Sequence, residues 1–274
     1  MHPQWLRPDW PAPSWVQAVC TTRPGGVSQG PFGAMNLGDH VGDEPVHVQA
    51  NRAGLAQALS ARPVFMQQVH GVEVMHVSDD SPDGICADAA VSQTPGLACT
   101  VMVADCLPIL LAHDRLPLVA ALHAGWRGLA GQTGGALAPT GALAPTGVIE
   151  STVAALARAA GCSVAELSPR LMAWLGPCIG PAAFEVGAEV RAALSAGRPE
   201  ALAHFSPAPQ GKYWADLPAL ARQRLAVLGV RRCFGNDGSP AWCTVADSVF
   251  FSHRRSWSVG GVSGGRMAAC IWLL

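Results

Sequence analysis

The segment VADCLPILLAHDRLPLVAALHAGWRG (residues 103–128) contains two apolar runs separated by the polar turn HDR. Continuous apolar runs of this length, bounded by polar residues, proline and glycine, are typical of strands buried inside a sheet. Four residues with reactive side chains stand at the ends of these runs: Asp105, Cys106, His123 and Arg127. Because several elements of a sheet can converge where strands end, the segment predicts two buried strands and a functional site beside them.

The same criteria predict further elements along the chain. With the two strands above, at 108–113 and 117–123, strands are expected at 15–22, 63–69, 72–77, 87–92, 97–104, 169–175 and 266–273. Helical periodicity predicts helices at 45–60, 148–161, 181–197 and 215–230. Strands and helices do not alternate throughout, which disfavours a doubly wound parallel fold. We therefore expect an α+β protein with mixed or antiparallel sheets flanked by helices.

The length of 274 residues allows one large domain or two small ones. No shift in composition marks a boundary, so a single domain over residues 1–274 is predicted. One segment, GQTGGALAPTGALAPTG (131–147), repeats the hexapeptide GALAPT and has low complexity. Two copies are too few to stack into a core, so this segment is interpreted as a flexible surface insertion without a catalytic role.

Composition limits the possible partners and location. The formal net charge is −1 and only 14% of the residues are charged, so the chain lacks the field needed to hold nucleic acid. The N-terminus does not resemble a signal peptide, and the longest apolar stretch is broken by Asp105 and Pro108. Nine scattered cysteines are typical of free thiols in a reducing compartment. We expect a cytoplasmic monomer or small homo-oligomer that binds small molecules and no membrane.

Three metal-competent side chains stand where apolar strands meet turns: His70 in QQVHG, Cys106 in VADCLP and His123 in ALHAGWRG. Two imidazoles and a thiolate suit Zn²⁺, with a fourth position left for water. Their long sequence separations match no zinc-finger pattern, so the site would be open and catalytic. Taken singly, each histidine is better explained as a hydrogen-bonded core or turn residue, and the cysteine as a buried apolar group.

These motifs combine with TTRPGGVSQGPFGAMNLGDHVGD, ADAAVS, GPCIGPAAFEVG and the terminal CT…FFSHRR…GR. In this order, from Thr21 to Arg266, they resemble the YfiH-like family, which is also named after a laccase domain and includes the peptidoglycan editing factor. The resemblance implies a layered α/β sandwich and a catalytic zinc centre at His70, Cys106 and His123. It also implies phosphorolysis of adenosine, inosine, guanosine and methylthioadenosine, and deamination of adenosine.

Several other residues are candidates for contacts with substrate or phosphate. Arg23, in the turn TTRPGGVS, could offer its guanidinium and nearby backbone N–H groups to an anion, although a simple turn is the alternative. Asn36 and Arg127 are also predicted to line the pocket. Trp126 is either a stacking partner for a purine or a core residue. The C-terminal arginines are interpreted as packing or ion-pair residues: Arg254, Arg255 and Arg266.

Two residues close to the predicted strand ends have ambiguous roles. Asp105 is the acid nearest to Cys106 in sequence and is either the acid or base of the reaction or a structural residue on the opposite face of the strand. Cys178 lies in the turn GPCIGP, where a helix N-terminus would activate a thiol, but a structural role explains it better.

Three other functions use the same residues differently. Cys106 as nucleophile and His123 as base would give a cysteine-type amide hydrolase for peptidoglycan precursor editing. A copper-dependent polyphenol oxidase with four coppers would require about ten histidines in clustered pairs, whereas the chain has nine and no His-x-His pair; a single copper at the three ligands remains open. A non-enzymatic zinc site would need a fourth protein ligand, such as His40, His76 or Cys178.

Overall fold

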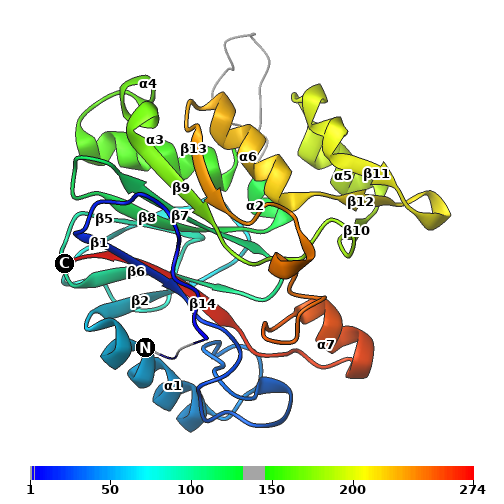
Figure 1. The fold of residues 1–274 in the computed structure, drawn as a ribbon, viewed down its shortest axis with the longest axis horizontal. Coiled ribbons are helices and arrows are strands. Elements are labelled where there is room, and N and C mark those ends of the chain that lie inside the picture. Colours follow the sequence, from blue (N-terminus) through cyan, green and yellow to red (C-terminus); the bar gives the residue numbers. More distant parts are fainter. Residues whose placement is uncertain (1, 3, 132–145) are drawn as a thin grey trace.

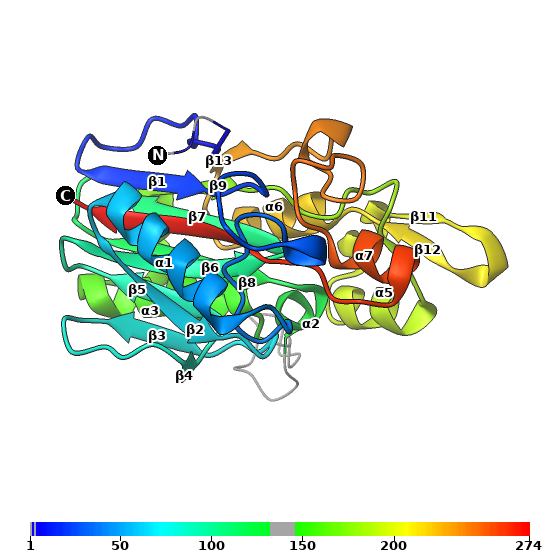
Figure 2. The ribbon, with the colours of Figure 1, turned by 90° about the horizontal axis from the view of Figure 1, so that it is seen from below.

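The computed structural model describes residues 2, 4–131 and 146–274, and the centre of the predicted insertion lies outside these residues. Two large mixed sheets form the body of the molecule (Figures 1 and 2). The five-stranded sheet has the order β1 (Val16–Cys20), β14 (Met267–Leu273), β6 (Leu97–Val103), β2 (Arg62–Gln67) and β4 (Ile85–Cys86). The six-stranded sheet has the order β13 (Arg232–Gly235), β9 (Leu171–Leu175), β7 (Leu107–His113), β8 (Val119–Ala124), β5 (Ala89–Ser92) and β3 (Val74–Val77).

The two sheets pack face to face because their central strands are apolar on both sides. Alternate residues of β7 point in opposite directions. Leu110 and Ala112 join a core shared with the five-stranded sheet, whereas Ile109 and Leu111 join the core on the outer face. This arrangement explains why the segment quoted above is apolar without alternation: both faces of its strands are buried.

Helices cover the two outer faces (Figure 1). On the six-stranded sheet, α3 (Val148–Ala160) and α6 (Leu217–Val227) contribute to the outer core. On the five-stranded sheet, α1 (Pro45–Leu59) buries Leu55 and Leu59 against that sheet's outer residues. The result is four layers, helix, sheet, sheet and helix, which confirms the predicted α+β class and the layered sandwich.

The predicted strands and three of the four predicted helices are present with small shifts of their ends. The prediction of one helix over 181–197 is wrong: only α5 (Ala188–Ser195) is helical, because the preceding residues form a turn and β10 (Glu185–Val186). This strand pairs with β12 (Tyr213–Ala215), which also pairs with β11 (Phe205–Pro207) in a small third sheet. Short elements that the sequence did not predict include α2 (Trp126–Ala130), α4 (Val164–Leu167) and α7 (His253–Gly260).

Local sequence determines where the helices begin. The Asp216 carboxylate accepts a hydrogen bond from the Ala219 N–H at the start of α6, and the Ser252 hydroxyl accepts one from the Arg255 N–H at the start of α7. No single helix in the described ranges is both long and apolar enough to cross a bilayer. Only α3 and the helical segment Val164–Arg170 together meet the criterion, and the two are bent by 89° relative to each other.

Candidate metal centre

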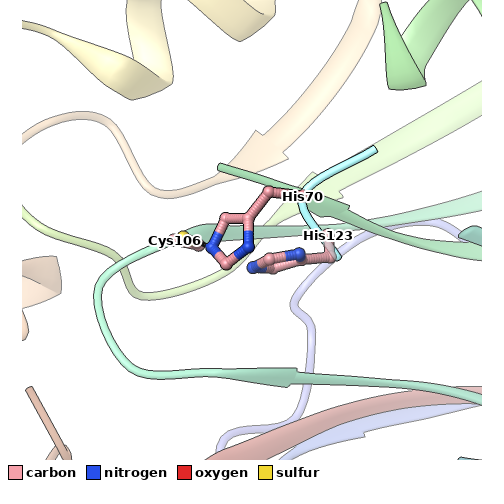
Figure 3. Close-up of side chains that lie close together, drawn as sticks. All are labelled: His70, Cys106 and His123. Atoms are coloured by element: carbon pink, nitrogen blue, oxygen red, sulfur yellow. Dashed lines mark hydrogen bonds between the residues drawn. The ribbon is translucent and has the colours of Figure 1, made fainter. Parts of the chain in front are cut away.

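His70, Cys106 and His123 converge at one end of the sandwich (Figure 3). Cys106 lies in the turn between β6 and β7, and His123 lies near the end of β8. The antiparallel pairing of β7 with β8 places Pro108 opposite His123, so the two ligands meet across the hairpin. His70 enters from the loop after β2. The ligand atoms of the three residues all lie within 4.8 Å of one another.

The geometry of the cluster fits a metal ion. A tetrahedral zinc with typical bond lengths separates a cysteine sulfur from a histidine nitrogen by about 3.5 Å. The Cys106 Sγ and the His70 Nε2 are 3.7 Å apart. The His123 Nδ1 is 2.8 Å from the Asp88 Oδ1, which leaves the His123 Nε2 for a metal. A carboxylate behind a ligating imidazole is the usual arrangement in zinc sites.

Asp88 organises both histidines, and the sequence analysis did not identify it. It is fully buried at the start of β5. Its Oδ1 accepts hydrogen bonds from the His123 ring and the His70 N–H, and its Oδ2 accepts from the N–H groups of Val69 and Gly71. These bonds hold His70 at φ +61°, which is uncommon for a residue other than glycine. The only sequence signal was an acid directly before a buried strand.

The charges of the cluster favour a thiolate beside an imidazolium. Burial alone would raise the pKa of Cys106, but the charge of His123 and hydrogen bonds from His123 and His70 lower it to about 6. Burial alone would lower the pKa of His123, but the Cys106 thiolate and the Asp88 carboxylate raise it to about 9. The carboxyl pKa of Asp88 is itself lowered: burial opposes this shift, and the contact with His123 and the backbone N–H groups outweigh burial. A thiolate is the form of cysteine that binds metals.

Two glycines of the motif HAGWRG allow the ligand side chains and the turn that carries His70 to pack closely together. A Cβ atom at Gly125 would lie 2.9 Å from the Cys106 Sγ and 2.9 Å from the His70 Cδ2. A Cβ atom at Gly128 would lie 2.8 Å from the Gly71 carbonyl oxygen, in the turn that carries His70. Both glycines are therefore required by close packing around the ligands rather than by backbone conformation.

We expect Gly125→Ala to weaken metal binding by about tenfold or more, because the new methyl group displaces two ligands at once. Competition with a chromogenic chelator measures the affinity. Gly54→Ala is the matched control, since Gly54 lies exposed in α1 with nothing within 4 Å of an added Cβ. It should leave metal affinity unchanged and raise stability slightly. Unchanged affinity in Gly125→Ala would mean that the three ligands do not bind together.

A cavity of about 390 Å³ opens onto the ligand cluster. Its apolar wall includes Ile179, Phe184 and Leu217. The Arg127 guanidinium also lines it, stacked on the Trp126 ring at 4.4 Å. Within the described ranges this guanidinium forms neither a hydrogen bond nor an ion pair, so it can bind an anion. Further polar groups complete the lining: His40, Gln68, His253, Arg254 and Arg266.

The other predicted contact residues lie elsewhere. Asn36 is fully buried; its amide donates to the Asp43 carboxylate and accepts the Arg266 N–H. Arg23 lines a different cavity, beyond α7. Arg255 does not line the first cavity. Its guanidinium donates hydrogen bonds to four backbone carbonyl groups. The structure therefore brings only Arg127 of the three predicted contact residues to the metal cluster.

Asp105 lies at the rim of the cavity in a turn, with φ +97°. Its carboxylate accepts hydrogen bonds of 2.6 Å from the Thr244 hydroxyl and from the Arg254 N–H. Both oxygens are therefore occupied, and the side chain ties the turn before Cys106 to the start of α7. This geometry favours the structural alternative over an acid or base.

The candidates for a fourth ligand do not join the cluster. In the part of the chain that the structure describes, the metal-competent group around Cys106 contains only the three predicted ligands. Cys178 is buried, and its sulfur accepts a hydrogen bond from the Asn236 amide. His76 lies exposed on β3. The cluster thus keeps an open position toward the cavity.

The four-layer α+β fold places a histidine and cysteine cluster beside a cavity, where the three side chains could hold a metal ion with one position open. Residues 17–274 match the family described as multi-copper polyphenol oxidoreductase laccase, and the chain belongs to this family. The resemblance to YfiH-like proteins is thereby confirmed.

Similar proteins cover the whole chain. A Pseudomonas aeruginosa protein named as a purine nucleoside phosphorylase is 45% identical, over 98% of each chain. The Escherichia coli protein named purine nucleoside phosphorylase YfiH is 43% identical, over 97% of this chain and 98% of that one. A solved Neisseria meningitidis structure superimposes with a TM-score of 0.83 at 40% identity, over 98% of each chain.

Proposed function

We propose that the protein is a zinc-dependent purine nucleoside phosphorylase with adenosine deaminase activity. The observation that carries the proposal is the cluster of His70, Cys106 and His123 at a cavity that the Arg127 guanidinium also lines. The names of its relatives support the phosphorylase activity. Adenosine, inosine, guanosine and methylthioadenosine are the proposed substrates, with phosphate as the second substrate, and the proposed location is the cytoplasm.

In phosphorolysis an oxygen of phosphate forms a bond to C1′ of the sugar while the bond from C1′ to N9 breaks. The electron pair of that bond leaves with the purine, which takes up a proton. Arg127 would bind and orient the dianionic phosphate, and the charges of Arg254 and Arg266 would favour it further. Phe184 and Trp126 offer apolar surface to the base.

His70, Cys106 and His123 would hold the zinc ion, which when bound acts as a Lewis acid on the purine or on water. Asp88 would keep the His123 ring in one orientation by accepting the proton on Nδ1 in a hydrogen bond. In deamination, water replaces the amino group at C6 of adenosine and gives inosine and ammonia. Both reactions would share the same apolar base site.

The test is product analysis by chromatography with adenosine, with and without phosphate. Protein stripped by a chelator should be inactive, and zinc should restore activity. We expect adenine and ribose 1-phosphate only when phosphate is present, and inosine in either case. Copper restored in place of zinc, with a phenolic substrate, tests the oxidase alternative, which the two-histidine, one-thiolate ligand set also allows.

The controls distinguish loss of the metal centre from a general loss of folded protein. Cys106→Ala should lose all products, whereas Cys86→Ala, which changes an exposed thiol on β4, should retain them. Absence of any nucleoside product from protein that carries stoichiometric zinc would contradict the proposal.

One observation favours a second candidate function. Cys106, His123 and Asp88 form a thiolate, imidazolium and carboxylate series, which is the arrangement of a cysteine-type amide hydrolase. Such an enzyme would cleave an amide bond, as in peptidoglycan precursor editing, without a metal. Hydrolysis of an amide substrate that persists after complete chelation would support this function over the first.

A further inference from the structure

A second cavity, of about 290 Å³, lies on the other side of α7. It shares no lining residue with the first cavity among the described residues: α7 contributes His253 and Arg254 to the first and Arg255 and Val259 to the second. Apolar groups make up much of its wall, namely Pro31, Phe251, Val259 and Val262. The proposed phosphorylase chemistry does not use it.

Two arginines, Arg23 and Arg255, line this cavity. Arg255 donates to the carbonyl oxygens of Thr244, Val245, Asp247 and Phe250, all of which are uncharged acceptors. Burial, and next the charge of Arg23, lower the pKa of Arg255, while the more distant Asp105 and Asp247 carboxylates partly oppose this shift. Throughout the described ranges no carboxylate forms an ion pair with either arginine. A second like charge in a half-buried site is unfavourable unless an anion compensates it.

Arg23 has hydrogen-bonding capacity to spare. Its Nε donates to the Gly33 carbonyl at 2.6 Å, and its guanidinium carbon lies 5.6 Å from the centre of the Phe251 ring. In the part of the chain described by the structure, no acceptor is bonded to its two terminal amino groups. The turn itself requires glycine at the two neighbouring positions. Gly25 has φ +99°, and a Cβ at Gly26 would lie 2.4 Å from the Ala34 oxygen. A simple turn therefore explains the glycines but not the arginine.

We propose that this cavity is a second ligand site, for a small amphipathic anion with an apolar chain and a carboxylate or phosphate monoester head. The terminal amino groups of Arg23 would bind the head in the bidentate manner that guanidinium allows. Phe251, Val259 and Val262 would contact the chain. Both head groups share the same chemistry at Arg23, a pair of anionic oxygens beside an apolar body.

Isothermal titration calorimetry of the full chain with octanoate and with octyl phosphate tests the proposal. We expect saturable binding with a single site, and the tighter of the two probes identifies the preferred head group. Arg23→Gln should weaken binding by about tenfold or more, since it removes the charge-assisted bonds. Val259→Asp introduces a negative charge at an 84% exposed position and should weaken binding similarly without disturbing the core.

Two controls locate the site. Val227→Asp changes a similarly exposed valine on α6, and Cys106→Ala changes the metal cluster; both should bind octyl phosphate like the unmodified protein. The proposal is overturned if neither anion binds saturably or if Arg23→Gln and Val259→Asp retain full affinity. It is equally overturned if octanol binds as tightly as octyl phosphate, or if inorganic phosphate binds that tightly and loses its affinity in Arg23→Gln, because the site would then not require both a charge and an apolar chain.

Discussion

Replacing Cys106 by alanine should lower the zinc affinity about a hundredfold or more and abolish nucleoside turnover. Structural zinc sites in peptides bind with roughly 10–16 kcal/mol, so loss of one ligand among three or four removes several kcal/mol. Cys106 is also the only anionic member of the cluster, so its loss leaves a cation site with two neutral imidazoles. The measurement is a competition titration with a chromogenic chelator, followed by product analysis.

The fold should survive this change, which keeps the result interpretable. Cys106 lies in a turn and is only partly buried, so its truncation removes few core contacts. Thermal unfolding of the metal-free proteins should therefore differ by little, with Cys86→Ala as the reference. A Cys106→Ala protein that binds zinc as tightly as the parent would show that the thiolate is not a ligand.

Replacing Asp88 by asparagine should weaken zinc binding by about 10- to 100-fold, the usual effect of removing a carboxylate behind a ligating histidine. Each carboxylate oxygen accepts two hydrogen bonds, one pair from His123 and His70 and the other from Val69 and Gly71. The asparagine NH₂ group must face one of these pairs in either orientation, and it can only donate. Two donors are then left without an acceptor.

Unlike Cys106→Ala, Asp88→Asn should also destabilise the metal-free protein, by about 1–3 kcal/mol, because the carboxylate is fully buried among its donors. Denaturant unfolding of the chelated protein measures this loss. Asp80→Asn is the matched control, since Asp80 is exposed in the turn after β3. If Asp88→Asn and Asp80→Asn had equal zinc affinities, the position of Asp88 behind the histidines would have no bearing on the metal centre.

The central sheets could be predicted because their signal is local. Strands such as β6, β7 and β8 are buried on both faces, so nearly all of their residues are apolar and the runs stand out in the sequence. Elements that form only through contacts with distant segments show no such run of apolar residues. The helix α7 buries none of its residues, and the two residues of β10 become a strand only through pairing with β12.

The same distinction separates the predicted ligands from the rest of the site. His70, Cys106 and His123 stand at strand ends, which the sequence reveals. The four hydrogen-bond donors of Asp88 come from two distant segments, so nothing near residue 88 indicated its role. Arg23 and Asn36 lie in motifs that belong to the family resemblance, but a motif does not specify which side of α7 a residue reaches, and Arg23 reaches the second cavity.

The three ligands also have a mechanical consequence, because they belong to both sheets of the sandwich. His70 follows β2 of the five-stranded sheet, whereas His123 lies in β8 of the six-stranded sheet and Cys106 lies in the turn that passes from one to the other. An ion bound to all three therefore cross-links the two sheets at their open end. By linkage, an ion present at a hundred times its dissociation constant adds about 2.7 kcal/mol against unfolding. Separation of the sheets at this end would require the ion to dissociate first, so the metal centre would also stabilise the fold.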